Sequence, residues 1–267
     1  FLYITAILLG IVFIFPFYYL IINSLKSLYV SQSILPQGLH WENFYYAVTL
    51  VPFFNQLKNS FLLILYNSIP VLIFNIIMGF AFARLKAPGK NFVFMLLLST
   101  IMLPGVATQI PQYLLFNRLG LRNTFWIWTL NAIGGSAVYI FLYRQFFANI
   151  PKELEEAARI DGCSTLRMLL KVFMPLAKPV IVIVTFQDFF SIWSDFMGPF
   201  MFLNMEKWPL STALMGAYYS FPGEAVHRNM DSVVNAASIL LILPVIVAFA
   251  FSQKYLVEGI STSGIKG

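Results

Sequence analysis

Six long runs of apolar residues, separated by polar or glycine- and proline-containing stretches, dominate the chain. A helix needs about 20 apolar residues to cross the hydrocarbon core of a bilayer, and each run approaches this length. The pattern predicts six membrane-spanning helices within one membrane domain, residues 1–267. Their expected positions are about residues 1–22, 60–83, 92–110, 124–143, 179–203 and 232–252. Pro104-Gly105 should close the third run, and Gly198-Pro199 should break the fifth near its end.

Composition agrees with this pattern. Hydrophobic residues make up 59% of the chain, charged residues 10%, and the mean hydropathy is +0.78. A water-soluble globular protein does not combine these values, so we expect an all-α integral membrane protein that contacts the lipid bilayer. The chain begins at Phe1 without a methionine and is already apolar there, so we expect that an N-terminal segment is missing.

The basic residues predict how the chain crosses the membrane. With both ends in the cytoplasm, most of the 17 Lys and Arg residues fall in cytoplasmic loops, as the positive-inside rule requires. The net charge of +6 is therefore read as a topology signal and not as a nucleic-acid-binding surface. This orientation places residues 146–178 in the cytoplasm.

The loop at residues 146–178 is expected to form two short helices around a glycine. Pro151 suits a first helical position, Gly162 can adopt the left-handed conformation that ends a helix, and Ser164 can cap a second helix. One interpretation is an amphipathic loop that lies on the membrane surface. The small side chains of Ala157 and Ala158 favour another, close approach by a second protein, because helices that lie on lipid prefer bulky anchors.

The same loop carries an extended motif. Glu156-Ala157-Ala158 is followed by Gly162 and then by Val172, Met174 and Pro175. This spacing resembles the EAA loop of permease subunits from binding-protein-dependent ABC importers. That pattern reads Glu-Ala-Ala, three residues, Gly, nine residues and Ile-x-Leu-Pro. Val and Met replace Ile and Leu here, and both keep the position apolar.

The resemblance implies that this segment is a coupling helix, which fits a cleft on a cytoplasmic ATP-binding subunit. The residues implied to make or support this contact are Glu155, Glu156, Ala157, Ala158, Arg159, Asp161, Gly162 and Pro175.

Further stretches are similar to the sugar-importer subgroup of these permeases, which contains the smaller membrane subunit of the maltose importer. They lie at residues 59–60, 81–90, 102–105, 110–113, 119–124 and 258–267. In the last stretch, the resemblance implies that Ser263, Gly264 and Lys266 contact the ATP-binding subunits. It also implies that residues 204–231, an expected outer loop, contact an external solute-binding protein.

What the resemblance implies for the whole chain is a type I ABC importer permease fold in the bacterial cytoplasmic (inner or plasma) membrane. The chain would be a transport subunit rather than an enzyme, passing a sugar or oligosaccharide delivered by the solute-binding protein. Its partners would be a second permease subunit and two ATP-binding subunits. Those ATP-binding subunits would hold ATP and Mg²⁺, and this chain would bind no cofactor or metal.

Two acids lie within the fifth apolar run. Asp188 and Asp195 are seven residues apart and are expected on nearly one helical face, with Ser191 between them and Trp193 nearby. A carboxylate at the bilayer centre costs about 2.5–3.5 kcal/mol on insertion scales, so both should face protein or water. One hypothesis is a polar wall of a substrate path, where carboxylates accept sugar hydroxyls. The alternative is structural, with the acids bonding helix ends or a partner.

The sequence favours this interpretation over a stand-alone secondary transporter and over an intramembrane enzyme. The sequence contains no Gly-x-x-x-x-Gly-Lys-Ser/Thr phosphate loop, which fits ATP hydrolysis by separate subunits. A stand-alone secondary transporter usually has paired internal repeats, and none is evident. An intramembrane enzyme would need a catalytic or metal-ligand group that the sequence does not supply. An importer for a non-sugar solute stays open.

Overall fold

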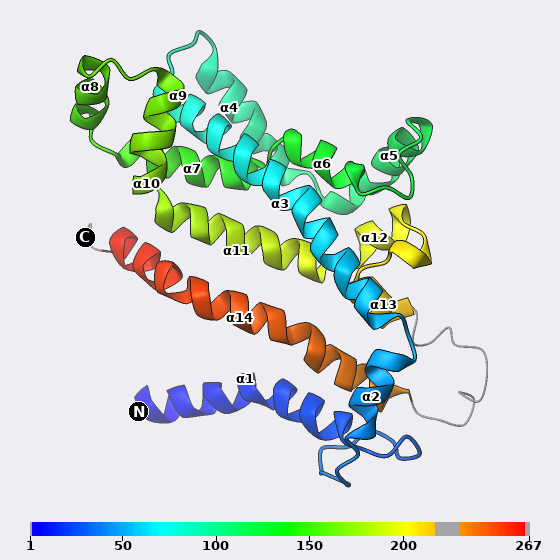
Figure 1. Ribbon diagram of the computed structural model, residues 1–267. Coiled ribbons are helices and arrows are strands. Elements are labelled where there is room, and N and C mark those ends of the chain that lie inside the picture. Colours follow the sequence, from blue (N-terminus) through cyan, green and yellow to red (C-terminus); the bar gives the residue numbers. More distant parts are fainter. Residues whose placement is uncertain (1, 217–229, 265–267) are drawn as a thin grey trace. The chain divides into compact units, whose positions relative to one another are not determined.

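The computed structural model describes residues 2–216 and 230–264, and helices account for most of them (Figure 1). No strand occurs within this described part of the chain. The long helices are α1 (Leu2–Ser24), α3 (Phe53–Arg84), α11 (Lys178–Ser194) and α14 (Asp231–Gly264). The expected all-α class is therefore confirmed.

Shorter helices connect the long ones. They are α2 (Glu42–Thr49), α4 (Lys90–Ser99), η1 (Thr100–Met102), α5 (Gly105–Arg118), α6 (Trp126–Ile133), α7 (Ala137–Asn149), α8 (Lys152–Ile160), α9 (Thr165–Met168), the π-helical turn η2 (Leu169–Phe173), α10 (Met174–Leu176), α12 (Met197–Phe202), η3 (Met205–Lys207) and α13 (Leu210–Gly216).

The chain forms two compact units. The first comprises residues 1–61 and 195–247. Its core is formed by α2, α13 and the N-terminal ends of α3 and α14, with residues such as Ala47, Leu210 and Val233. The second comprises residues 62–194 and 248–267, and its core gathers aromatic side chains from α3, α7 and η2.

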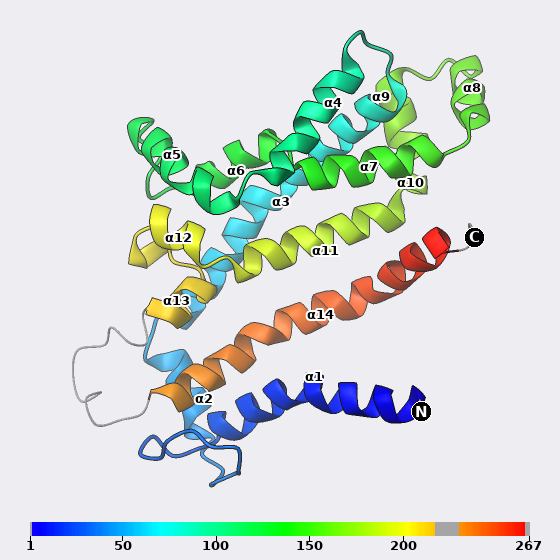
Figure 2. The ribbon, with the colours of Figure 1, turned by 180° about the vertical axis from the view of Figure 1, so that it is seen from behind.

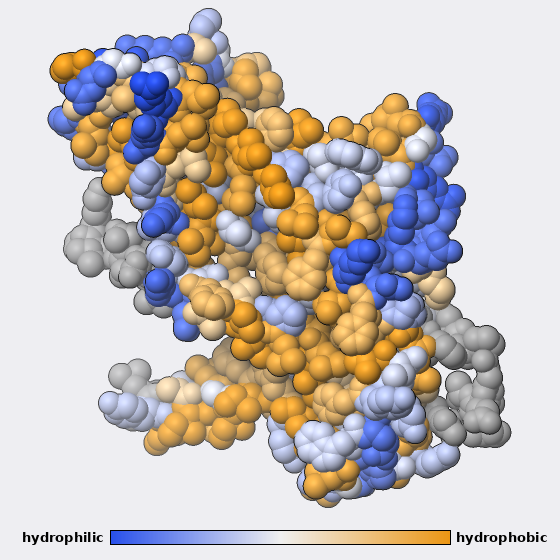
Figure 3. Space-filling view, viewed as in Figure 1, coloured by the Kyte–Doolittle hydropathy of each residue, from blue (hydrophilic) through white to orange (hydrophobic). Residues whose placement is uncertain are grey.

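Several helices can cross a membrane by length and composition. Among the described residues, Tyr3–Ser24, Phe53–Arg84 and Asp231–Leu256 qualify singly, and two bent pairs raise the number to as many as five. The pairs are Lys90–Met102 with Gly105–Arg118, bent by 101°, and Thr165–Leu176 with Lys178–Ser194, bent by 83°. Figure 3 shows apolar side chains covering long stretches of the helical surface, as lipid contact requires.

The third expected span ends at Pro104-Gly105 as predicted: Leu103 is extended (ψ 119°), as residues before proline usually are, and α5 then begins at Gly105. The breaks in the next two expected spans differ from the sequence prediction. The fourth is divided at Gly134-Gly135-Ser136 into α6 and α7. The fifth ends at Ser194, before Gly198-Pro199, and Pro199 lies inside α12.

Helix α3 holds the broken fourth span in place. The Asn75 side chain is fully buried; its Oδ1 accepts a 2.7 Å hydrogen bond from the backbone N–H of Ser136, which precedes α7. Gly79 lets α7 approach closely, because a Cβ there would lie 2.4 Å from the Cβ of Tyr143. Nearer the start of α3, the Tyr66 carbonyl accepts a 2.7 Å hydrogen bond from the Thr129 hydroxyl of α6.

Candidate functional site

The expected pair of helices around Gly162 is present. Helix α8 ends at Ile160, and Gly162 adopts the left-handed conformation with φ +73°. The Gly162 N–H donates to the Arg159 carbonyl at 3.0 Å, and the Cys163 N–H donates to the Ala158 carbonyl at 2.9 Å. This pair of bonds is a Schellman motif, which satisfies the last carbonyls of the helix.

Ser164 begins the second helix as predicted. Its hydroxyl accepts a hydrogen bond from the Arg167 backbone N–H at 3.4 Å, which caps α9. In Figures 1 and 2, α8 lies at one end of the second unit, next to α9. Two predicted local signals, a terminating glycine and a capping serine, therefore shape the turn between α8 and α9.

The predicted coupling residues divide by exposure. The exposed members of the set are Glu156, Ala157, Arg159, Asp161, Gly162 and Pro175. By contrast, Ala158 is 6% exposed and belongs to the core of the second unit. The Glu155 side chain is 16% exposed and lies within 2.9 Å of the guanidinium of Arg159, one helical turn away. Helix α8 therefore presents one free face and packs by the other.

The segment after Gly162 is anchored by aromatic packing. Met168, Leu169 and Phe173 are buried, whereas Leu166 and Leu170 are more than half exposed. The Phe173 ring meets the Phe80 ring of α3 edge-on, with centroids 5.0 Å apart. Such contacts between rings stabilise a core beyond the area they bury, and they fix η2 against α3.

Arg84 is a functional candidate that the sequence interpretation did not identify. It ends α3, and its guanidinium donates to the backbone carbonyls of Phe147 and Ile150 at the end of α7. One guanidinium nitrogen also lies 3.5 Å from a Glu155 carboxylate oxygen in α8. In the sequence, the stretch 81–90 stands out only by its resemblance to the importer subgroup, and nothing local indicates a partner of Arg84 more than 60 residues away.

Asp188 lies inside the second unit. It is 4% exposed, and one of its oxygens accepts a 3.0 Å hydrogen bond from the Asn67 side-chain amide. The other oxygen accepts a hydrogen bond from the Ser68 hydroxyl. Both donors belong to α3, so this carboxylate joins α11 to α3.

The other residues of the predicted substrate path lie in different settings. Ser191 is exposed, and Trp193 is 3% exposed and stacks on Phe189 with ring centroids 5.6 Å apart. Asp195 lies one residue beyond the end of α11, and its side chain accepts a 3.0 Å bond from the Gly198 N–H at the start of α12. Because α11 ends at Ser194, the single helical face expected for both acids does not continue to Asp195.

Two further predicted contact regions are only partly described. Ser263 and Gly264 lie in the last turn of α14, and Lys266 lies outside the described residues. The expected outer loop contains η3 and α13, and α13 is buried from Leu210 to Leu214. Asn204, Met205 and Glu206 are exposed, and residues 217–229 lie outside the described part.

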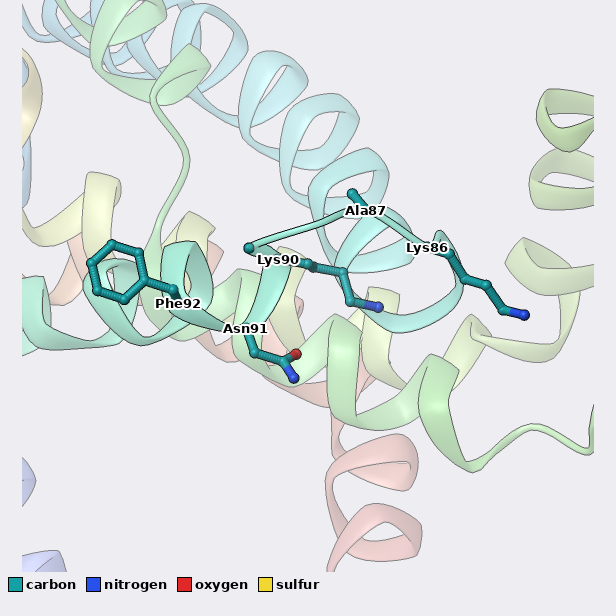
Figure 4. Close-up of a pocket in the computed structure, with 6 residues that line it drawn as sticks. Lys86, Ala87, Lys90, Asn91 and Phe92 are labelled. Atoms are coloured by element: carbon teal, nitrogen blue, oxygen red, sulfur yellow. The ribbon is translucent and has the colours of Figure 1, made fainter.

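A shallow surface pocket of about 330 Å³ lies where α3 turns into α4 (Figure 4). Lys86, Lys90, Asn91 and Phe92 line it together with Ala87 and Gly89. The ammonium group of Lys90 donates to the Leu85 carbonyl at 2.8 Å, so this cation stabilises the turn itself. Within the described residues, no group of three or more His, Cys, Asp or Glu side chains is placed to hold a metal ion.

One family model and several transport permeases match this chain over most of its length. Residues 44–262 match the family described as binding-protein-dependent transport system inner membrane component. The melibiose/raffinose/stachyose import permease protein MelC of Bacillus subtilis is 30% identical over 256 residues, which cover 94% of this chain and 91% of MelC. The arabinooligosaccharides transport system permease protein AraQ of Halalkalibacterium halodurans is 30% identical over 236 residues, covering 87% and 81%.

A solved structure has a similar fold. One chain in the crystal structure of a bacterial ABC transporter involved in the import of the acidic polysaccharide alginate superposes with a TM-score of 0.82. The two chains are 25% identical, and the match covers 94% of this chain and 95% of that one.

Proposed function

Because the chain belongs to the family of binding-protein-dependent transport system inner membrane components, we propose that it is the permease subunit of an ATP-driven importer for a sugar or oligosaccharide. MelC and AraQ are named for the import of melibiose, raffinose, stachyose and arabinooligosaccharides, and the similar solved structure belongs to an alginate importer. These relatives support a saccharide as the class of substrate for this chain.

The observation that carries the proposal is the exposed face of α8 and its terminating turn. Glu156, Ala157 and Gly162 are exposed, while Ala158 on the other face packs into the core. A helix that packs against its own protein by one face and exposes the other can insert the exposed face into a cleft on another protein. We assign that cleft to an ATP-binding subunit, with two such subunits, a second permease subunit and an external solute-binding protein completing the importer. ATP and Mg²⁺ belong to the ATP-binding subunits.

The proposed location is the bacterial cytoplasmic membrane, with both ends of the chain in the cytoplasm. This orientation follows from the basic residues of the loops and puts α8 on the side where ATP is available. In such an importer, ATP-driven closure of the ATP-binding subunits moves α8 and turns the membrane cavity outward. The solute-binding protein then releases its sugar, and hydrolysis returns the cavity to the inward-facing state.

The substrate path along α11 stays a prediction. The Asp188 carboxylate accepts two hydrogen bonds from side chains of α3, whereas Ser191 is exposed on α11, as a residue that lines a substrate path would be. Replacement of both acids, Asp188→Asn with Asp195→Asn, tests this path in the assembled importer. Unchanged substrate affinity and transport rate would remove both acids from it.

The experiment that tests the proposed function is ATP hydrolysis by the complex that co-purifies with this chain. The rate is measured with and without the solute-binding protein, against a panel of oligosaccharides. We expect one saccharide class to stimulate hydrolysis in the presence of the solute-binding protein. If no ATP-binding subunit co-purifies, the coupling role of α8 is wrong and a stand-alone transporter becomes the better hypothesis.

A further inference from the structure

Arg84 connects a long membrane helix to the proposed coupling segment. Its side chain is 6% exposed although it is the last residue of α3. A buried guanidinium requires several partners, because its five N–H donors and its charge have been removed from water. The structure supplies those partners from three segments other than α3.

The first partners are carbonyls at the end of α7. The Arg84 Nε and one terminal nitrogen donate to the Phe147 carbonyl at 3.1 and 2.6 Å, and the same terminal nitrogen donates to the Ile150 carbonyl. The last carbonyls of a helix carry partial negative charge and can accept bonds from side chains, although the Phe147 carbonyl also accepts the Ile150 N–H at 3.3 Å. A cation bonded to them therefore fixes the point where α7 ends and the chain turns toward α8.

The other partners belong to the coupling segment itself. Glu155, in the first turn of α8, has a carboxylate oxygen 3.5 Å from an Arg84 nitrogen. The guanidinium carbon also lies 5.1 Å from the centre of the Phe173 ring in η2, a cation–π distance. One side chain of α3 thus contacts the segments on both sides of the exposed turn at Gly162.

We infer that Arg84 is the positioning residue that ties α8 to α3, so that displacement of α8 moves the membrane helix with it. The inference rests on the proposed function, because it assumes that an ATP-binding subunit displaces α8. Without this tie, the connections at residues 150–151 and 161–164 can absorb a displacement of α8. The result would be ATP hydrolysis that no longer drives transport.

Arginine suits these contacts better than lysine would. Its planar guanidinium group donates to several oxygens in fixed directions, whereas the lysine ammonium is a single point charge on a flexible chain. Arg84→Lys therefore keeps the charge near Glu155 but loses the simultaneous bonds to both carbonyls. Arg84→Gln removes the charge as well. Lys86→Gln is the matched control, because Lys86 is an exposed cation two residues farther along the chain.

The first readout is the ratio of saccharide transported to ATP hydrolysed, measured for the complete importer in vesicles. A folding defect reduces the amount of complex but leaves this ratio unchanged. We expect the ratio to fall roughly tenfold in Arg84→Gln, within the usual range of coupling between sites, and less in Arg84→Lys. The Lys86→Gln complex should keep the wild-type ratio. A wild-type ratio in both Arg84 variants would overturn the inference.

A second readout reports the tie directly. Spin labels at positions 87 and 152, which are exposed, measure the separation of the α3 end from α8 in a Cys163→Ser background. We expect a broader distance distribution in Arg84→Lys than in Lys86→Gln. Equal distributions would show that α8 is held by other contacts and would overturn the inference.

Glu155→Gln is a milder variant for the case that the Arg84→Gln complex fails to assemble, because it leaves the bonds from Arg84 to the two carbonyls intact. We expect it also to lower the ratio of saccharide transported to ATP hydrolysed. An unchanged ratio in both Glu155→Gln and Arg84→Lys would overturn the inference.

Failure of this inference differs from failure of the proposed function. If the wild-type complex shows no saccharide-stimulated ATP hydrolysis, the proposed function is wrong. If the wild-type complex is stimulated and the Arg84 variants keep its transport ratio, only the role of Arg84 is wrong.

Discussion

The Ser68 hydroxyl of α3 donates a hydrogen bond to the Asp188 carboxylate of α11, so two helices far apart in sequence are joined by buried polar groups. Asn67 donates to the other carboxylate oxygen at 3.0 Å. Polar side chains inside a membrane domain are costly unless they are paired, and here α3 provides both donors. The pairing fixes which face of α11 meets α3.

We predict that Asp188→Ala destabilises the protein. The amide of Asn67 and the hydroxyl of Ser68 lose their acceptor, and an unsatisfied buried donor costs about 1–3 kcal/mol. The melting temperature of the purified complex should fall, and Ser68→Ala should produce a smaller decrease. Ser191→Ala is the control because Ser191 is exposed on the same helix. Equal melting temperatures for Asp188→Ala and Ser191→Ala would contradict a structural role for Asp188.

We also predict that Gly79→Ala is poorly tolerated. The added Cβ would lie 2.4 Å from the Tyr143 Cβ and 3.2 Å from the Arg144 backbone nitrogen, so α3 and α7 must separate. Overpacking of this kind typically costs about 1–3 kcal/mol. Gly10→Ala in α1 makes the same chemical change where no atom of the described residues lies within 4 Å. Thermal unfolding should separate the two variants, and identical unfolding would contradict the close packing.

Apolar patterning predicted the long helices well. The first, second and sixth apolar runs correspond to α1, α3 and α14, because an uninterrupted apolar run has few alternatives to a helix in a membrane. The break at Gly134-Gly135 was missed, since the residues on both sides of it are equally apolar. The side chain that accepts a hydrogen bond at this break, Asn75, lies 61 residues away in sequence. Patterning within one segment cannot reveal such a partner.

Asn75→Ala tests the cause of that break. The Ser136 N–H loses its acceptor while remaining partly buried, and we expect a destabilisation of about 1–3 kcal/mol. Asn91→Ala, an exposed change of the same type at the start of α4, should leave stability within about 0.5 kcal/mol of wild type. Protease sensitivity of the α6–α7 connection is a second measurement, and it should rise only in Asn75→Ala. Unchanged stability and sensitivity would show that the break does not depend on Asn75.

The candidate site shows the same division between local and distant signals. Gly162 and Ser164 were predicted correctly because a helix end and a cap depend on neighbouring residues. Whether a given residue of α8 faces outward depends on what packs behind it. Ala158 therefore proved to be buried, and Arg84 became evident only from its contacts with α7, α8 and η2.

Gly162→Leu is the variant that separates docking from folding. Gly162 has φ +73° and Gly89 has φ +72°, and at both positions the structure leaves open space around an added Cβ. A leucine at either position therefore pays a similar conformational cost, roughly 1–2 kcal/mol for a left-handed residue. Only Gly162 belongs to the exposed turn that we propose as the docking surface. We expect both variants to insert into the membrane, and we expect only Gly162→Leu to uncouple transport from ATP hydrolysis. Normal transport by a correctly inserted Gly162→Leu protein would refute the docking role. Equal losses in Gly162→Leu and Gly89→Leu would assign the effect to backbone strain, because the two positions share their geometry and differ in the surface they belong to.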